Sequence, residues 1–331
     1  MAAPNQRGVA LIMVLLAMAL VVTLVGGMTH HQALRVYKAT HQMARIQGQG
    51  IAYGAEAFAK QILRQDYDED QEENLFVDSA EEVWAQYSAV VPVEQGRGVV
   101  EVQINDLGGR LNLNNLLAAT GEVNEQARQR LDRLLTLLEI QSVRPAGVID
   151  WIDSNRQTVN AYGAEDGDYL VMDPPYRAAN QPFADVSELR LIEGMTEKAY
   201  QALAPYVTAL PVSGTGINVN MAAPLLIQSL HPNLTASQAE SVVQQRADSP
   251  FENIEEFLAL PEFAGLGLKA DGLAVRTRFF DVASRVTYND NTYRLVTRMY
   301  RAQDGSFSVL GRDEGQRNLI TKERFSVSGE G

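Results

Sequence analysis

A long uncharged segment near the N-terminus is the feature that most constrains this chain. From Val9 to Met28 the sequence carries no charged side chain. About 20 apolar residues, each rising ~1.5 Å along a helix, span the hydrocarbon core of a bilayer. Arg7 is the one basic side chain on the N-terminal side, so the positive-inside tendency keeps the short N-terminal end in the cytoplasm. The sequence therefore predicts a single-pass membrane protein whose bulk has crossed the membrane.

The helical pattern continues beyond the membrane segment. An ordinary secretory signal has a shorter apolar region and a small-x-small cleavage site. Here apolar residues keep a helical spacing between Gln32 and Gln65: Leu34, Val36, Tyr37, Met43, Ile46, Ile51, Phe58, Ile62 and Leu63. We therefore expect one long helix that leaves the membrane and packs against a head.

Composition limits the classes of function that are open to this head. The chain has 331 residues with 46% hydrophobic content, enough for more than one core. Its 28 basic and 41 acidic side chains give a net charge of -13, which disfavours binding to the phosphates of nucleic acid. The chain has no cysteine, so a disulfide framework, a thiolate nucleophile and a cysteine zinc site are excluded. We expect a membrane stem with two packed folding units and no nucleic-acid partner.

The junction Gln6-Arg7-Gly8-Val9-Ala10-Leu11-Ile12 resembles the type III signal of prepilins and pseudopilins. In that family a short basic leader ends in glycine, a prepilin peptidase cleaves after the glycine, and the apolar helix is retained. The resemblance implies processing between Gly8 and Val9. The alternative is an uncleaved signal anchor with an incidental Arg-Gly pair.

The fifth position after the predicted cleavage site departs from the common pilin pattern. Most members of the family carry glutamate there, where the carboxylate pairs with the N-terminal amine of a neighbouring subunit, since an unpaired charge in lipid is costly. This chain has Met13 instead. Such a subunit is not expected to repeat along a filament, and the minor pseudopilin K family of type II secretion systems is similar in lacking this glutamate.

The rest of the chain predicts strands on both sides of a long helical block. The runs Val90–Val93 and Val99–Ile104 read as a hairpin, and the acidic stretch Asp66–Glu73 before them as a solvated loop. The helical pattern runs from Leu107 to about Asp271, most clearly in Val123–Ile140, where apolar residues share a face.

Strand patterns then return towards the C-terminus. Alternating residues from Phe280 to Tyr288, a turn at Asn289–Asn291, and the runs Tyr293–Tyr300 and Phe307–Leu310 indicate further strands. Strands on both sides of the helical block predict an insertion into a smaller domain, which again resembles the pseudopilin K family.

The predicted fold is α+β, with a pilin-like long N-terminal helix, a small antiparallel-sheet domain and a large inserted all-helical domain. The predicted segments are a cleaved leader (1–8), a transmembrane part (9–28), a stem helix (29–65), a pseudopilin α/β domain (66–106 and 273–331) and the insertion (107–272).

The helical block contains a weak internal repeat. Leu111-Asn112-Leu113-Asn114 is similar to Ile217-Asn218-Val219-Asn220, and Phe183–Leu189 is similar to Phe251–Phe257. Shared capping chemistry at helix N-termini and a true duplication are two open explanations.

The segment Ile149–Asn180 concentrates oxygen-bearing side chains in a loop with glycine and proline. Such oxygens suit a hard cation, and Ca²⁺ takes six to eight of them. The spacing is not that of an EF-hand, because Arg156 follows Asp153-Ser154-Asn155 and the required glycine and distant glutamate are missing. Composition alone leaves a calcium site and a solvated acidic loop equally open.

The pseudopilin K family has a matching run of D-W-I-D, G-A-E-D, P-P-Y and N, and its members bind calcium in the inserted domain. That resemblance implies calcium here, with candidate ligands Asp150, Asp153, Glu165, Asp166, Asp168 and Asn180. In the alternative interpretation, Asp150 and Asp153 cap the preceding helix and Asn180 closes a turn.

Two other functions have weaker support. The stretch Leu230–Phe257 is similar to a helix-hairpin-helix, which suggests a membrane-anchored DNA receptor of the competence type. Its hairpin His231-Pro232-Asn233-Leu234 lacks the Gly-x-Gly that lets backbone amides approach phosphate. An anchored envelope hydrolase is the other alternative, although the four histidines offer no catalytic or metal-ligand spacing.

The resemblance to the pseudopilin K family implies a non-enzymatic subunit at the tip of the type II secretion pseudopilus, where it initiates assembly and supports export of folded proteins across the outer membrane. The implied location is the inner membrane, with the head in the periplasm. The implied partners are the other minor pseudopilins and the prepilin peptidase, with the secreted proteins and the outer-membrane channel as further contacts. A type IV minor pilin is separated from this interpretation by the resemblance alone.

Overall fold

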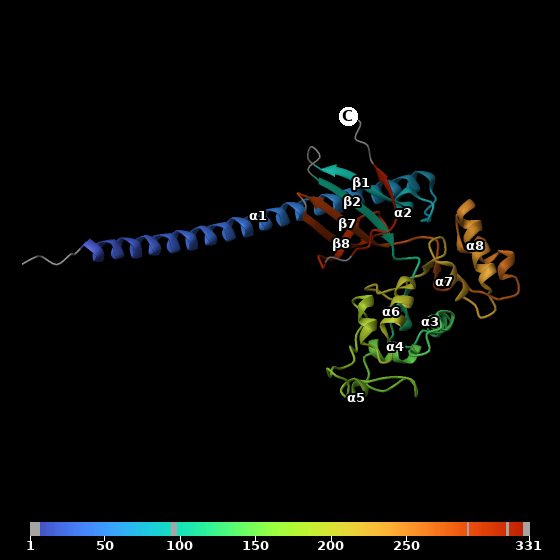
Figure 1. Cartoon of the computed structure of the whole chain (residues 1–331). Coiled ribbons are helices and arrows are strands. Elements are labelled where there is room, and N and C mark those ends of the chain that lie inside the picture. The colour runs from blue at the N-terminus through green and yellow to red at the C-terminus, as the bar shows by residue number, and fades with distance from the viewer. Residues whose placement is uncertain (1–6, 94–97, 290, 316–317, 327–331) are drawn as a thin grey trace, which may run out of the picture.

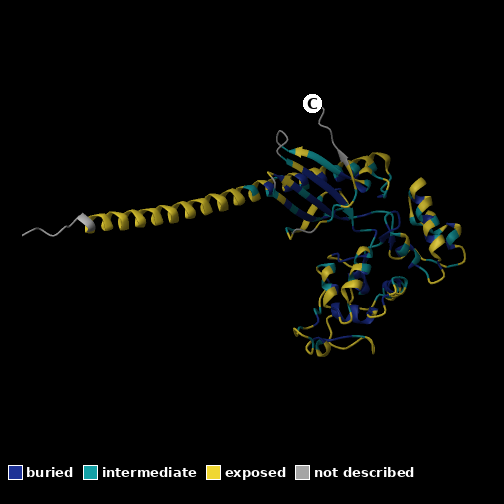
Figure 2. Ribbon diagram, in the orientation of Figure 1, coloured by how far each residue is buried: buried dark blue, intermediate teal, exposed yellow. Residues whose placement is uncertain are grey.

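A computed structural model of the chain describes residues 7–93, 98–289, 291–315 and 318–326 (Figure 1). Most of the predicted leader, residues 1–6, lies outside the described residues. Helix α1 (Arg7–Glu73) is 67 residues long and extends away from the rest of the molecule. Within the described part of the chain, α1 is the one helix that is long and apolar enough to cross a membrane. Figure 2 shows its N-terminal half exposed on all sides.

The acidic stretch Asp66–Glu73 is the last part of α1, so the prediction of a solvated loop was wrong. An isolated acidic segment at a helix C-terminus is disfavoured by the helix dipole. Here the head supplies the compensating charge, because Arg301 pairs with Asp66 at 3.2 Å. Tyr67 of the same turn is buried, and its hydroxyl donates to the Gln303 carbonyl. The stem helix therefore ends at Glu73 and not at residue 65.

A six-stranded sheet packs against the C-terminal half of α1, with the strand order β10-β1-β2-β7-β8-β9. The strands are β1 (Tyr87–Val93), β2 (Gly98–Asp106), β7 (Phe279–Tyr288), β8 (Asn291–Arg301), β9 (Phe307–Asp313) and β10 (Glu323–Ser326). Neighbours are antiparallel except β1 and β10, which are parallel. The predicted hairpin is confirmed in the pairing of β1 with β2, and β1 begins three residues before its predicted start. The strands predicted around Asn289–Asn291 pair as β7 and β8, but Asn291 already belongs to β8, and residue 290 lies outside the described residues.

Strand β8 runs alongside α1, away from the membrane segment. Gly48 of α1 lies so close to Tyr293 that an added Cβ would come within 3.1 Å of its Cβ. Further along, the Thr297 hydroxyl donates to Glu56 at 2.7 Å, and Arg301 meets Asp66. Alanines on α1 let the helix approach the sheet closely, since Ala52, Ala55 and Ala59 are buried in the core they share with the strands. The sheet thus has a distal end, defined here as the end near Arg301 where α1 terminates.

The insertion leaves the sheet after β2 and returns at β7, so both connections lie at the distal end. Its first half contains β3 (Leu111–Asn112), η1 (Leu113–Leu116), α3 (Glu125–Leu137), α4 (Pro145–Ile152), α5 (Asp166–Tyr169), η2 (Val186–Leu191), α6 (Glu197–Leu203), η3 (Ala204–Tyr206) and β4 (Val207–Thr208). Its second half contains β5 (Ile217–Asn218), α7 (Pro224–Gln228), α8 (Ala236–Asp248), α9 (Ile254–Leu258), η4 (Pro261–Phe263) and β6 (Leu273–Ala274). The insertion extends past the predicted boundary at residue 272, because β6 lies beyond that residue and pairs with β5. The predicted helix is observed as α3, with Ala127, Leu131 and Leu134 buried.

The two members of the internal repeat make the same hydrogen bonds in the structure. The side-chain amide of Asn114 donates to the Phe183 carbonyl at 3.0 Å and accepts from the Phe183 amide at 2.8 Å. Asn220 makes the same pair of bonds with Phe251, both at 2.9 Å. Each half also closes with a parallel strand pair, β3 with β4 and β5 with β6. Capping chemistry alone does not create these matched contacts, so the structure favours duplication.

Candidate functional site

The acidic loop connects α4 to η2 in the first half of the insertion, and three of its carboxylates are buried. Asp150 sits in the last turn of α4, and Asp153 directly follows that helix. Asp150, Asp153 and Glu165 are 0%, 5% and 7% exposed. The second half has no counterpart of this loop, because Phe251 follows α8 after two residues. Burial of three carboxylates in such a short segment needs a compensating partner.

Several of these buried oxygens have no hydrogen-bond donor. Oδ1 of Asp150 accepts from the Val159 amide at 2.8 Å, but its Oδ2 has no partner. Both carboxylate oxygens of Glu165 are also buried without a partner. Gly163 makes room for the first of these groups, because a Cβ there would lie 1.8 Å from Oδ2 of Asp150. Unsatisfied buried carboxylate oxygens are the ligands that Ca²⁺ prefers, so this donor set fits the predicted ion.

The pKa shifts in the loop show the same deficit of positive charge. Burial raises the pKa of Asp150 to about 6, and the negative charge of Asp153 adds to the rise. Burial also raises the pKa of Asp153 and of Glu165, the latter further through repulsion from the two aspartates. At neutral pH the three groups therefore repel one another, and a divalent cation would offset both the burial and the repulsion.

The other predicted ligands have local roles that do not require an ion. Asp166 forms an ion pair with Arg177 at 2.7 Å. Asp168 accepts from the Glu165 amide at 2.9 Å at the start of α5. The side-chain amide of Asn180 lies 3.1 Å from the carbonyl oxygen of Asp153. Either the amide nitrogen donates a hydrogen bond to that carbonyl, or the amide oxygen faces the carbonyl and both oxygens bind one cation. The structure thus brings Asn180 to the buried aspartates and leaves Asp166 and Asp168 in supporting positions.

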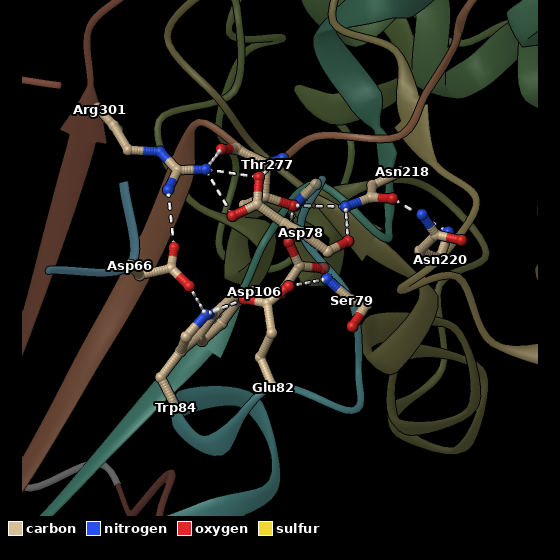
Figure 3. A network of polar contacts seen from close by, with 11 residues as sticks. Asp66, Asp78, Ser79, Glu82, Trp84, Asp106, Asn218, Asn220, Thr277 and Arg301 are labelled. Carbon is tan, nitrogen blue, oxygen red and sulfur yellow. Dashed lines mark hydrogen bonds and ion pairs between the residues drawn. The ribbon is translucent and has the colours of Figure 1, made fainter. Parts of the chain in front are cut away.

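A second acidic cluster was not predicted from the sequence. Among the described residues, Asp66, Asp78 and Glu82 are the three acidic groups whose carboxylate oxygens lie within 4.8 Å of one another. Figure 3 shows this cluster at the distal end of the sheet. Arg301, fully buried, pairs with Asp66 and Asp78, and Trp84 donates its indole N–H to Asp66 at 3.1 Å and to Glu82. A guanidinium therefore already supplies the positive charge that a metal would bring.

The acidic cluster and Arg301 belong to a larger set of contacts that also includes Thr277 and Asn218, called the junction network here. It joins the stem, the sheet and the insertion. Thr277 donates its amide to Asp78 at 2.7 Å and its hydroxyl to Asp106 at the end of β2. Asn218 of β5 donates to the Asp78 carbonyl at 2.9 Å and to the Thr277 hydroxyl at 3.1 Å (Figure 3). Arg301 itself could have indicated this network from the sequence. Alternate residues of β8 face inward, and Arg301 is a charged residue at one of these inward-facing positions. These hydrogen bonds connect β5 of the insertion to the segments that flank the sheet.

The network predicts an inverted pH dependence of stability. Burial and the charge of Asp66 raise the pKa of Glu82 to about 9, and burial raises the pKa of Asp78 to about 6. A carboxyl with a raised folded-state pKa binds protons more tightly in the folded state, so stability falls as pH rises from about 4 towards that pKa. Glu82→Gln keeps a neutral hydrogen-bonding group, so we expect it to stabilise the protein by about 1–3 kcal/mol at pH 8. Urea denaturation at pH 5 and pH 8 measures the free energy of unfolding of both proteins. If this free energy changes between the two pH values as much in Glu82→Gln as in the wild type, the prediction is contradicted.

Comparisons with known proteins agree across the chain. The family described as "Type II secretion system (T2SS), protein K" matches residues 109–212 and, through a second sequence profile, residues 217–276. The type II secretion system protein K of Pseudomonas aeruginosa is 35% identical over 95% of this chain and 95% of its own length. The protein K of Klebsiella pneumoniae is 32% identical over 94% and 97%, respectively.

A solved structure supports the same assignment at the level of the fold. One chain of the GspK-GspI-GspJ complex from the enterotoxigenic Escherichia coli type 2 secretion system superposes with a TM-score of 0.75. It is 26% identical, and the match covers 85% of this chain and all of that chain. Both the insertion and the sheet domain are therefore shared with these proteins, and the chain belongs to the type II secretion system protein K family.

Proposed function

We propose that this protein is a minor pseudopilin at the tip of the type II secretion pseudopilus, where it initiates assembly and supports export of folded proteins across the outer membrane. The observation that carries this proposal is the attachment of the insertion at the distal end of the sheet, beside the end of α1. A subunit in the body of a filament must leave that space for the subunit above it, whereas a tip subunit need not.

The stem supports a membrane-anchored tip subunit. The apolar part of α1 fits an inner-membrane anchor, with the head in the periplasm. Met13 on this helix carries no carboxylate to pair with a neighbour's amine, as a repeating subunit would require. Leu34, Val36 and Ile46 remain exposed on the stem because the sheet covers α1 only from about Gly48 onwards. Stems of neighbouring subunits would cover these side chains.

The partners follow from the solved complex, in which GspK assembles with GspI and GspJ. By analogy, this protein assembles with the other minor pseudopilins of its own secretion system. Co-expression of the full-length protein with tagged minor pseudopilins, followed by purification in mild detergent, tests this. We expect a stable complex, and recovery of the protein alone would contradict the assignment.

Calcium is the proposed ligand of the acidic loop. Asp150, Asp153, Glu165 and Asn180 would hold the ion, and Asp166 and Asp168 would support them. The unpartnered buried oxygens of Asp150 and Glu165 support this proposal. The ion would balance the buried charge and fix the loop, a structural role and not a catalytic one.

The competing functions gain no support from the described residues. His30, His31 and His41 lie exposed on the stem, and His231 lies between α7 and α8. This arrangement brings no histidine to the acidic loop, so we propose no enzymatic activity. The α7–α8 hairpin does form, but without the glycines that bind phosphate. DNA binding at physiological salt would favour the receptor function instead.

Processing of the N-terminus gives a separate prediction. Gly8 and Val9 lie in the first turn of α1, and the proposed peptidase cleaves between them. In cells with the prepilin peptidase, mass spectrometry of the membrane-extracted protein is expected to detect an N-terminal peptide that begins at Val9. Cells without the peptidase should retain the leader. The same uncleaved N-terminus in both strains would show an ordinary signal anchor.

A further inference from the structure

A groove lies between the distal end of the sheet and the linker that joins the two halves of the insertion. It has a volume of about 670 Å³. Apolar side chains from the linker and the sheet form most of it: Leu210, Pro211, Val212, Phe279, Tyr300 and Leu310. We call it the distal groove.

Strand β9 gives the groove an open edge. β9 is the last strand of the sheet on this side, and it pairs with β8 alone. A register shift opposite Arg298 and Met299 leaves Leu310 without a partner residue in the ladder, and Leu310 remains 44% exposed. Val212 on the facing linker is 45% exposed. Bulges on edge strands re-aim side chains, and here the bulge presents Leu310 to the groove.

Two arginines line this groove, and one of them is open to a ligand. Arg276 lies over the ring of Phe76 with its Nε and Nη2 buried, and the negative charges of Asp78 and Asp70 already act on it. Arg278 lies over the ring of Tyr300, which also lines the groove. Among the residues that the structure describes, no carboxylate oxygen lies within ion-pair distance of the Arg278 guanidinium. In a chain with a net charge of -13, an unpaired guanidinium beside an apolar surface favours a ligand that brings a carboxylate.

The position of the groove indicates the side from which its ligand comes. Phe279 begins β7 and Tyr300 is next to the last residue of β8, so both lie at the distal end, near the C-terminus of α1. A subunit anchored by its own stem lies beside α1, whereas a protein that is free in the periplasm reaches this end from beyond the tip.

We propose that the distal groove binds an extended segment of an exported protein, in which a large apolar side chain is followed by a carboxylate. The apolar side chain packs between Val212 and Leu310, and the carboxylate pairs with Arg278. The source of the segment rests on the proposed tip function, whereas its chemistry rests on the groove alone.

Peptide binding tests the chemistry. The probes are the labelled, N-acetylated and C-amidated peptides Gly-Ser-Phe-Leu-Asp-Gly and Gly-Ser-Phe-Leu-Asn-Gly, with the full-length protein in detergent. We expect the aspartate peptide to bind at least about tenfold more tightly, as a charge-assisted pair does. Arg278→Gln should reduce its affinity to that of the asparagine peptide, and Arg144→Gln, an exposed arginine elsewhere on the insertion, should not. Equal affinity of the two peptides, or an effect of both variants, would overturn the inference.

Crosslinking in cells tests the source. A photoreactive residue at Val212 is expected to crosslink to exported proteins at segments with an aspartate or glutamate beside a large apolar residue, and Arg278→Gln should abolish these products. Products with the outer-membrane channel or another pseudopilin instead would overturn the assignment of the ligand. The same cells report filament assembly. Filaments that require this protein but give no crosslink would overturn the groove alone, whereas filaments that form without it would overturn the tip function.

Discussion

Replacing Arg301 by leucine is expected to lower the free energy of unfolding by about 3–5 kcal/mol. The guanidinium is fully buried and pairs with Asp66 and Asp78, and it also donates to the Thr277 carbonyl at 2.7 Å. Leucine would leave Asp78 buried with no positive partner, and removing one member of a buried pair costs far more than the pair contributes net. The loss should therefore exceed that of an ordinary surface substitution.

Urea denaturation of the full-length protein in detergent at pH 7 measures this change. Arg64→Leu is the matched control, because Arg64 makes a half-exposed i,i+4 pair with Asp68 at 3.0 Å. Such a pair contributes about 0.3–0.5 kcal/mol. If Arg301→Leu lowers the free energy of unfolding no more than Arg64→Leu does, the junction network does not hold the insertion to the sheet.

Saturating calcium is expected to raise the melting temperature of the protein by roughly 5–10 °C. A ligand at 100 times its dissociation constant stabilises the folded state by about 2.7 kcal/mol, and each kcal/mol shifts the melting temperature of a large domain by about 2–4 °C. Sites outside the cytosol commonly bind calcium with dissociation constants of about 10⁻⁴–10⁻³ M, so a hundredfold excess corresponds to about 10–100 mM calcium. The buried carboxylates of the acidic loop make the effect specific to the insertion.

Variants separate a calcium site from a general charge effect. Asp153→Asn and Glu165→Gln should remove most of the shift, because both side chains belong to the buried set. Asp173→Asn is the control, because Asp173 lies exposed in the same loop. A melting temperature that is the same with calcium and with chelator would defeat the metal proposal. An equal loss of the shift in all three variants would indicate screening by a divalent cation instead.

Elements with a clear period were predicted well from the sequence. The 3.6-residue period of α3 and the two-residue alternation of β7 and β8 each report one buried face. The apolar run at the N-terminus needs no tertiary information, because length and lack of charge determine it. The insertion was also recognisable, since strand patterns stop before it and resume after it.

Elements that depend on distant partners were not predicted. The end of α1 reads as an acidic loop until Arg301, more than two hundred residues later, supplies its charge. The distal groove is formed by the linker and the sheet together, so no local pattern marks it. In the acidic loop, the sequence supplied the residue types but could not separate the buried Glu165 from Asp166, which Arg177 neutralises.

The most direct test of the tip assignment is the location of this protein on assembled pseudopili. Gold labelling of an epitope placed after Gly331, on filaments sheared from cells that overproduce the major pseudopilin, gives that location by electron microscopy. A tip subunit is expected to show one label at one end of each filament, with few filaments in cells that lack the protein. Labels repeated along the filament length, or filaments of normal number without the protein, would contradict the account.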